Sequence, residues 1–262
     1  MIIEASFDPV TCCQVKDIRA LMKQEGICDL SVQPSADGIL SIQERARLLK
    51  LAFGTYRHIH IVQGKKADRI LEGYEEEEKK VRSGYFRLVP PAVRRYLIDN
   101  NLYLQQIVEA QCSLKRAIHS KGVADTCVIL AHAHHLDEKL AERMGYLHDI
   151  TKSMSDEEGR AILERWSPSD LSLHPKIWHS RTAVFWLKQN MGLYDPRILL
   201  PIWNHTLGNG KSSYDRILYI ADKIEPNRNY DTTYHLALAR KDLKKAVDLV
   251  MKEGEEYRKK GN

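Results

Sequence analysis

Long apolar runs, paired cysteines and a strong excess of one charge are all missing from this 262-residue sequence. No apolar run approaches the roughly 18 residues of a membrane-spanning helix, and Glu4 comes too early for a secretory signal peptide. The five cysteines are odd in number and include no Cys-x-x-Cys pair, which argues against a disulfide framework and for a reducing cytoplasm. Forty basic against thirty-five acidic residues leave a net charge of +5, a mild excess that does not indicate a nucleic-acid-binding protein. We therefore expect a cytoplasmic globular protein whose partners include neither a membrane nor a nucleic acid.

The first hundred residues carry a mixed pattern of strands and helices. Met1–Ser6 and His58–Val62 are predicted as strands, and Ser41–Phe53 has apolar residues at helical spacing. The charged run Glu75–Lys80 is predicted as a solvated helix face. Pro90 and Pro91 open a further helix, because proline is tolerated in a first turn.

From Leu104 onward, one predicted helix follows another. Gln105–Ser120 and Ala124–His134 are amphipathic, and Gly122 is expected to separate them. Ser155–Glu158 has the pattern of a capping box, and Asp195 with Pro196 predicts the start of another helix. The fold class we predict is mainly α, with a small α/β domain at residues 1–104 and an all-helical domain at residues 105–262.

Histidine is the most informative residue type here, with eleven copies. A subset of histidines and aspartates falls about one helix and loop apart, beside apolar residues that would face a core. Buried imidazoles and carboxylates are costly unless they are paired or bound to metal. Six such groups suffice for two divalent ions, with Asp149 as the carboxylate that bridges them. The candidate ligands are His119, His148, Asp149, His179, His205 and Asp222.

Two alternatives remain open at this point. The histidines could be unrelated core or surface residues, and His174 competes with His179 because both belong to the start of one predicted helix. Cationic and hydroxyl side chains close to the candidate ligands favour a phosphate ester or anhydride as substrate, because developing phosphoryl charge must be offset. These side chains are Arg116, Lys152, Thr206 and Arg228.

The C-terminal motifs together resemble the YqeK family of HD-domain phosphohydrolases. The resemblance rests on Arg116–Ser120, Leu147–Lys152, His179-Ser180, His205–Gly208 and Ile220–Arg228, which occur in this order. The distance along the chain from His179 to His205 matches the family pattern, so the resemblance favours His179 over His174. The resemblance implies that the six candidates named above are the metal ligands, with Asp149, Lys152 and Asp222 catalytic. It also implies that Arg116, Ser120, Lys152, Thr206 and Arg228 bind substrate.

The same resemblance implies a bacterial enzyme with two divalent metal ions, commonly iron, although manganese, cobalt or zinc would suit these ligands. The implied reaction is symmetrical cleavage of diadenosine tetraphosphate into two ADP by a metal-activated hydroxide. Alternatives are hydrolysis of another nucleotide, such as a nucleoside diphosphate or a guanosine alarmone, and a non-catalytic nucleotide sensor. The sequence makes no prediction of oligomeric state.

The N-terminal segment resembles nicotinate-nucleotide adenylyltransferase in a shortened and degenerate form. The resemblance rests on Ala5–Val10, Glu44–Ala52, Val81–Pro90 and Leu102-Tyr103. In that family a His-x-Gly-His or Thr-x-Gly-His loop binds the triphosphate, whereas this chain has Thr11-Cys12-Cys13-Gln14. Cys13 replaces the glycine that permits close backbone approach, and Glu75–Glu78 would repel phosphate. We therefore expect a nucleotidyltransferase-like remnant without adenylyl transfer.

Overall fold

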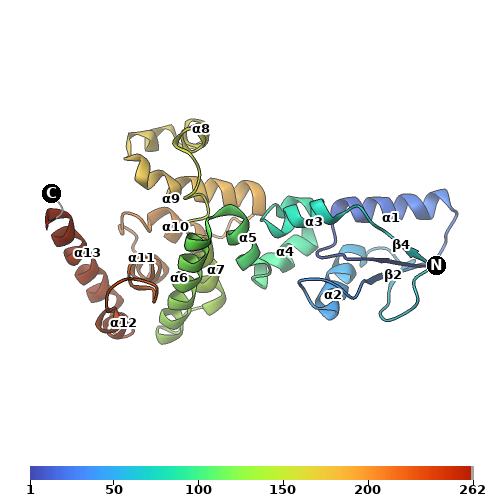
Figure 1. The fold of residues 1–262 in the computed structure, drawn as a ribbon, viewed down its shortest axis with the longest axis horizontal. Helices are drawn as coiled ribbons and strands as arrows, with labels where there is room; N and C mark the ends of the chain where they lie inside the picture. Colours follow the sequence, from blue (N-terminus) through green and yellow to red (C-terminus); the bar gives the residue numbers. More distant parts are fainter. Residues whose placement is uncertain (261–262) are drawn as a thin grey trace. The chain divides into compact units, whose positions relative to one another are not determined.

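The computed structural model describes residues 1–260, which form two compact units (Figure 1). The boundary between the units falls between Leu102 and Tyr103, whereas the sequence analysis places it between residues 104 and 105. The expected helical domain also includes residues 261 and 262, which lie outside the described residues. The predicted fold class is confirmed, because helices dominate and the small sheet is confined to the N-terminal unit.

The N-terminal unit is built on a four-stranded parallel sheet in the order β3-β2-β1-β4. Ile3 of β1 pairs with Val32 of β2, and both side chains are fully buried. Right-handed βαβ connections require helices between parallel strands, which is where α1 and α2 occur. The elements are β1 (Ile2–Ala5), α1 (Cys12–Gln24), β2 (Leu30–Pro34), α2 (Ile42–Phe53), β3 (Ile59–Ile61), β4 (Arg69–Ile70), α3 (Glu75–Arg82), a 3-10 turn (Phe86–Leu88) and α4 (Pro91–Asp99).

One expectation for this unit is wrong. Helix α3 forms where the charged run predicts it, but its acidic face is not entirely solvated. Glu78 is only 2 % exposed, and it accepts hydrogen bonds from Ser6 Oγ at 2.5 Å and from Gln14 Nε2 at 2.8 Å. A buried carboxylate is tolerated here because polar partners from two other segments satisfy it.

The C-terminal unit consists of helices throughout residues 103–260. Capping residues begin several of them as the sequence predicts: Ser155 forms a capping box with Glu158, and Asp195 accepts from the Arg197 backbone N–H. The elements are α5 (Leu104–Gln111), α6 (Leu114–Ala133), α7 (Glu138–Leu147), α8 (Asp156–Trp166), a 3-10 turn (Pro168–Ser172), α9 (Pro175–Trp186) with a π turn (Leu187–Met191), α10 (Pro196–Asn204), α11 (Ser213–Ile224), α12 (Thr233–Ala239) and α13 (Leu243–Lys260).

The expected break at Gly122 is also wrong, because α6 runs unbroken through it and the chain breaks instead before Leu114. Gly122 serves packing: an added Cβ would lie 2.5 Å from Glu225 Oε2 and 2.8 Å from Asn227 Nδ2. Gly145 similarly lets α7 approach α6, since an added Cβ would lie 2.5 Å from the Ala124 Cα. The two glycines therefore bring the α6–α7 pair and the segment after α11 close together.

None of the helices within residues 1–260 is both long enough and apolar enough to cross a bilayer.

Candidate metal centre

The six candidate ligands lie in or at the ends of five helices of the C-terminal unit. His119 lies in α6 and His179 in α9, while His148 and His205 are the C-cap residues of α7 and α10. Asp149 follows His148 directly, and Asp222 lies in the last turn of α11. Apart from His119, whose side chain is 17 % exposed, all of them are buried.

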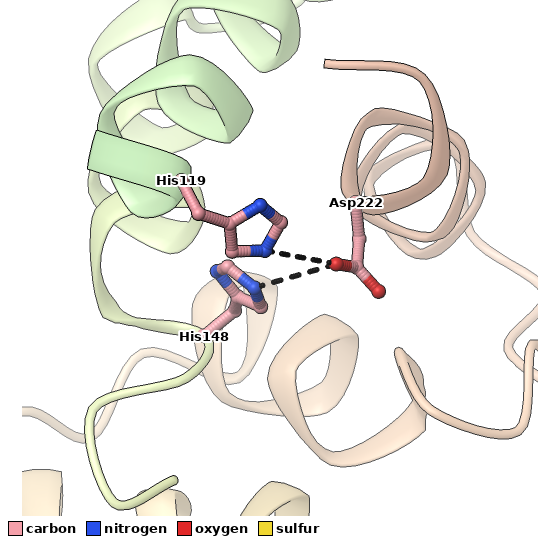
Figure 2. A group of neighbouring side chains, drawn as sticks. All are labelled: His119, His148 and Asp222. Atoms are coloured by element: carbon pink, nitrogen blue, oxygen red, sulfur yellow. Dashed lines mark ion pairs between the residues drawn. The ribbon is translucent and has the colours of Figure 1, made fainter. Parts of the chain in front are cut away.

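One set of donors gathers around Asp222. His119 Nε2 lies 3.2 Å and His148 Nε2 lies 3.7 Å from the same oxygen, Asp222 Oδ1. Figure 2 shows both imidazoles pointing at this oxygen from the α6–α7 side, with Asp222 opposite them on α11. His119, His148 and Asp222 thus form a three-donor group of the kind that holds a metal ion.

A second set gathers around Asp149, and the two oxygens of that carboxylate face different sets. Asp149 Oδ1 lies 3.1 Å from His179 Nε2 and 3.5 Å from His205 Nε2. Asp149 Oδ2 lies 3.8 Å from His148 Nε2, which belongs to the first set. The two oxygens of Asp149 therefore face different histidines of the centre.

In three of the four histidines, Nδ1 lies within hydrogen-bonding distance of an oxygen outside the centre. His148 Nδ1 lies 2.7 Å from Gly145 O, and His205 Nδ1 lies 2.7 Å from Ile202 O. His119 Nδ1 lies 3.2 Å from Glu225 Oε1. A hydrogen bond from Nδ1 to an oxygen fixes the tautomer and leaves the Nε2 lone pair for a metal. The backbone and Glu225 therefore orient Nε2 of these rings inward.

The charges of the site fit a cation. Burial lowers the pKa of His179 to about 4 and also lowers the pKa of His205, so both rings are neutral at pH 7 and can act as ligands. Burial alone would raise the pKa of Asp149, but the neighbouring histidines, His148 foremost, hold that pKa well below its usual range. Burial likewise opposes ionisation of Asp222, yet Lys223 and His119 hold its pKa well below the usual range. Burial opposes protonation of His148, yet Asp149 and Asp222 raise its pKa. Two ionised carboxylates are therefore buried beside the neutral rings of His179 and His205.

Nε2 of His148 provides a test of whether these residues suit a metal. This atom is buried and has no hydrogen-bond partner, although two carboxylates lie within 3.8 Å of it. A buried imidazole nitrogen without a partner is costly, whereas a divalent cation would satisfy it. Ligand atoms about 2.1 Å from one ion lie roughly 3 to 3.5 Å apart, close to most of the separations found here. The residues present fit a divalent metal.

A cleft of about 1010 Å³ opens above this centre and collects most of the predicted substrate-binding residues. Lys152 Nζ lies 2.8 Å from His179 Nδ1, and Thr206 Oγ1 lies 3.3 Å from His179 Nε2. Arg116 and Arg228 pair with the ligand carboxylates, at 3.6 Å from Asp149 Oδ2 and 3.3 Å from Asp222 Oδ1 respectively. The structure thus brings together four of the five side chains that the sequence assigned to substrate.

Ser120 is the exception, because its side chain is buried and does not line the cleft. Adjacent helical residues point about 100° apart, so Ser120 turns away when His119 faces the metal centre. His174 is also absent from the centre: it caps α9 by accepting from the Lys176 backbone N–H, while His179 lies inside the helix.

Glu225 and Lys223 were not assigned a role from the sequence, although both lie in the motif that follows Asp222. Glu225 is 2 % exposed, contacts His119, and accepts from the backbone and side-chain amides of Asn227 at 2.7 and 2.9 Å. Lys223 Nζ lies 2.5 Å from Asp222 Oδ2, and both residues line the cleft. The sequence feature that could have identified Lys223 and Glu225 is their position within one helical turn of Asp222.

Thr11 is the N-cap of α1 and Gln14 lies in the first turn of that helix, and the side chains of both are bound to α3. Thr11 Oγ1 donates to Glu77 Oε2 at 2.6 Å, and Gln14 Nε2 donates to Glu78 Oε1 at 2.8 Å. Gln14 Oε1 accepts from the Thr11 backbone N–H at 2.8 Å. Two glutamates of the acidic run therefore already contact the loop that the resemblance associates with phosphate.

Comparison with known proteins places this centre in a family. The model of the HD domain matches residues 116–227, which include all six candidate ligands. The symmetrical bis(5'-nucleosyl)-tetraphosphatase of Bacillus subtilis is 34% identical over 144 residues, which cover 53% of this chain and 77% of that protein. The chain belongs to the HD-domain family of hydrolases.

Other relatives of this HD-domain protein extend the comparison. A Mycoplasma pneumoniae protein named "probable nicotinate-nucleotide adenylyltransferase/Ap4A hydrolase" is 33% identical over 175 residues, 64% of this chain. This chain spans about half of that relative, 51% of its length. A crystal structure from Clostridium acetobutylicum, described as a predicted HD superfamily hydrolase involved in NAD metabolism, aligns with a TM-score of 0.55 at 28% identity, covering 61% of this chain and 87% of that one.

Proposed function

We propose that this protein hydrolyses diadenosine tetraphosphate symmetrically into two ADP, using two divalent metal ions. The observation that carries the proposal is the convergence of six donors, five of them buried, in two sets that share Asp149, within a cleft bordered by cations. The names of the Bacillus subtilis and Mycoplasma pneumoniae relatives support the choice of substrate.

The two ligand sets have distinct members in this proposal. His119, His148 and Asp222 would hold one ion, His179 and His205 would hold the other, and Asp149 would offer one oxygen to each. We propose iron as the metal, with manganese, cobalt and zinc as ions that the same mixture of imidazole and carboxylate accepts. When bound, such ions would lower the pKa of a water molecule and polarise the phosphoryl group as Lewis acids.

The cationic side chains of the cleft hold the polyphosphate. Lys152 and Arg228 bind the phosphates that do not react, while Arg116 and Thr206 orient the chain of phosphates. The guanidinium groups of Arg116 and Arg228 are about one-third exposed, so they reach the cleft while remaining paired with the ligand carboxylates. Placing these charges beforehand stabilises the additional negative charge of the transition state.

The site of action follows from the same reasoning. A small nucleotide is the partner, and we propose a bacterial cytoplasm as the compartment, because the free cysteines Cys12, Cys13 and Cys28 are exposed and suit a reducing environment. Neither a nucleic acid nor a membrane is part of the proposal.

Product identification tests the reaction. Purified protein is incubated with diadenosine tetraphosphate, with and without a chelator, and the nucleotides are separated by chromatography. We expect ADP as the only product and no product with the chelator. Equal amounts of AMP and ATP would mean asymmetric attack and would overturn the proposal.

Two other functions would use the same centre, and assays with further nucleotides distinguish them from the proposed reaction. A nucleoside diphosphate or a guanosine alarmone cleaved faster than diadenosine tetraphosphate would favour another hydrolase activity. Binding of nucleotide without turnover of any of them would favour a sensor.

The N-terminal unit does not transfer adenylate in this proposal. Thr11 binds Glu77 and Gln14 binds Glu78, and the two carboxylates oppose a triphosphate at this end of α1. The test is formation of a dinucleotide from ATP and nicotinate mononucleotide by the full chain. Transfer that depends on Thr11 or Gln14 would make the protein bifunctional.

A further inference from the structure

A second cavity of about 880 Å³ adjoins the metal cleft within the C-terminal unit. We call it the α13 cleft, because α13 forms one of its walls. The border between the two cavities consists of side chains that line both of them. These border residues are Thr206, Lys223, Arg228 and Tyr230.

The border is cationic and lies directly beside the metal centre. Lys223 and Arg228 both contact Asp222, and Thr206 Oγ1 lies 3.4 Å from His205 Nε2. Tyr230 donates its hydroxyl to the Lys223 backbone carbonyl, which fixes its ring at this border. A chain of phosphates that leaves the metal centre in this direction would therefore pass two positive charges before it enters the α13 cleft.

The α13 cleft is lined by aromatic and apolar side chains together with the charged side chains of Glu253, Glu255 and Arg258. Tyr219, Tyr257 and His235 contribute rings, and Val250 and Met251 contribute aliphatic surface. His235 is bound through Nε2 to Glu253 at 2.6 Å, and its buried Nδ1 has no hydrogen-bond partner. Nucleobases stack on aromatic side chains and offer polar edges to such atoms.

We propose that the α13 cleft binds the second nucleoside of a dinucleoside polyphosphate, while the metal cleft binds the first. This inference rests on the proposed function. Symmetrical cleavage requires the reacting phosphorus near the middle of the substrate, so an equal half must extend to either side of the metal centre. The two adjoining cavities, of about 1010 and 880 Å³, provide a place for each half.

The proposal predicts selectivity for two-nucleoside substrates. Adenosine tetraphosphate carries the same four phosphates but only one nucleoside, so it leaves the α13 cleft empty. After cleavage, each half is ADP, and the protein should therefore bind two ADP molecules per chain.

Gly254 allows the α13 cleft to be blocked without strain. It lies in α13 and lines the cleft, and a Cβ added to it meets no atom within 4 Å. In Gly254→Trp the new ring should fill part of the cleft, and replacing a helical glycine does not weaken the helix. Lys244→Trp is the control, since it places the same ring on an exposed position of the same helix.

The measurement compares kcat/KM for diadenosine tetraphosphate with kcat/KM for adenosine tetraphosphate. We expect Gly254→Trp to lower the ratio of the two about 10-fold, the range of one lost base–aromatic contact, and Lys244→Trp to keep the wild-type ratio. Tyr257→Ala, at an 81 % exposed position that tolerates truncation, should lower the ratio in the same direction. An unchanged ratio in both cleft variants would overturn the proposal.

Calorimetric titration with ADP provides a readout that does not depend on turnover. Wild-type and Lys244→Trp proteins should bind two ADP molecules, and Gly254→Trp should bind one. Cleavage of diadenosine tetraphosphate by the wild type with a single ADP site would overturn the inference but not the proposed function. Two ADP sites, one of them lost in Gly254→Trp, without any cleavage would support the cleft and overturn the proposed reaction.

Discussion

Both units bury polar side chains that come from separate segments, but they satisfy these side chains in different ways. In the N-terminal unit, Gln14 and Glu78 bind each other, and the buried Arg45 guanidinium donates to backbone carbonyls that include Ser6 O and Leu40 O. In the C-terminal unit, His148 and His205 turn Nδ1 to backbone carbonyls and His119 turns it to Glu225, while their Nε2 atoms point at a shared centre. His148 Nε2 remains without a partner there.

This difference separates a structural cluster from a binding site. Polar groups that complete their hydrogen bonds among themselves stabilise the unit that contains them and leave nothing for a ligand. Groups that converge while keeping lone pairs available are costly unless a ligand completes them. Resemblance to a family exists in both units, but only the C-terminal cluster leaves its donors available.

The largest expected effect comes from removing the carboxylate that joins the two donor sets. Asp149→Ala should lower turnover at least about 1000-fold and remove bound metal together with it, because both sets lose a shared ligand. Elemental analysis and ADP release measure the two effects. Gln14→Ala, in the self-satisfied cluster, is the control and should change neither; full metal content in Asp149→Ala would contradict the bridge.

A smaller effect is expected from crowding the residue that orients His119. Gly122→Ala places a Cβ 2.5 Å from Glu225 Oε2, so the carboxylate must leave the position in which its Oε1 contacts His119. We expect metal affinity to fall about 10-fold, the lower end for a lost outer contact, while α6 gains helix propensity. Metal titration with a competing chelator measures the affinity. Gly254→Ala, a helical glycine with open space around it, should keep wild-type affinity, and equal affinities for all three proteins would exclude the positioning role of Glu225.

In the N-terminal unit the expected effect is on stability. Glu78→Ala removes the acceptor of Ser6 and Gln14 and leaves a buried amide without its partner, which should cost about 2 to 3 kcal/mol. Urea unfolding measures this loss, and ADP release should stay at the wild-type rate. Glu76→Ala, at an exposed position of the same helix, should change stability by less than about 0.5 kcal/mol. Similar losses in both variants would show that the cluster is not what stabilises the unit.

The smallest expected effect is a pH dependence of the N-terminal unit. Burial, together with a hydrogen bond to Asp17, raises the pKa of Tyr74 to about 12. Because this pKa exceeds the unfolded value of about 10, the stabilisation is complete below pH 10 and is lost as the pH rises through 12. The difference in Tm between wild type and Tyr74→Phe should therefore shrink from pH 9 to pH 12.

The control for this titration is Tyr257→Phe, which changes an exposed tyrosine of the other unit. Its N-terminal unit should unfold like that of the wild type at every pH. A constant difference between wild type and Tyr74→Phe over this range would contradict the raised pKa.

Local features of the fold were predictable because they depend on residues close together in the chain. Ser155 and Asp195 cap helices as expected, and Ile3 lies on β1, where a strand was predicted. Strand β2, which contains Val32, was not predicted. Gly122 misled the prediction because a glycine in a helix is read as a break when no neighbour is known. Its actual function, close approach of Glu225, depends on a residue about a hundred positions away.

The sequence by itself determined the mainly α class and the set of histidines and aspartates at one-per-helix spacing, since these follow from local periodicity and motif order. Only the tertiary structure decided which oxygen of Asp149 faces which histidines, that Glu225 orients His119, and that Ser120 turns away from the cleft. It also decided that an aromatic cavity adjoins the metal cleft, because residues from 206 to 258 meet there. Such contacts arise from the packing of distant helices, and a single sequence does not record the distances between them.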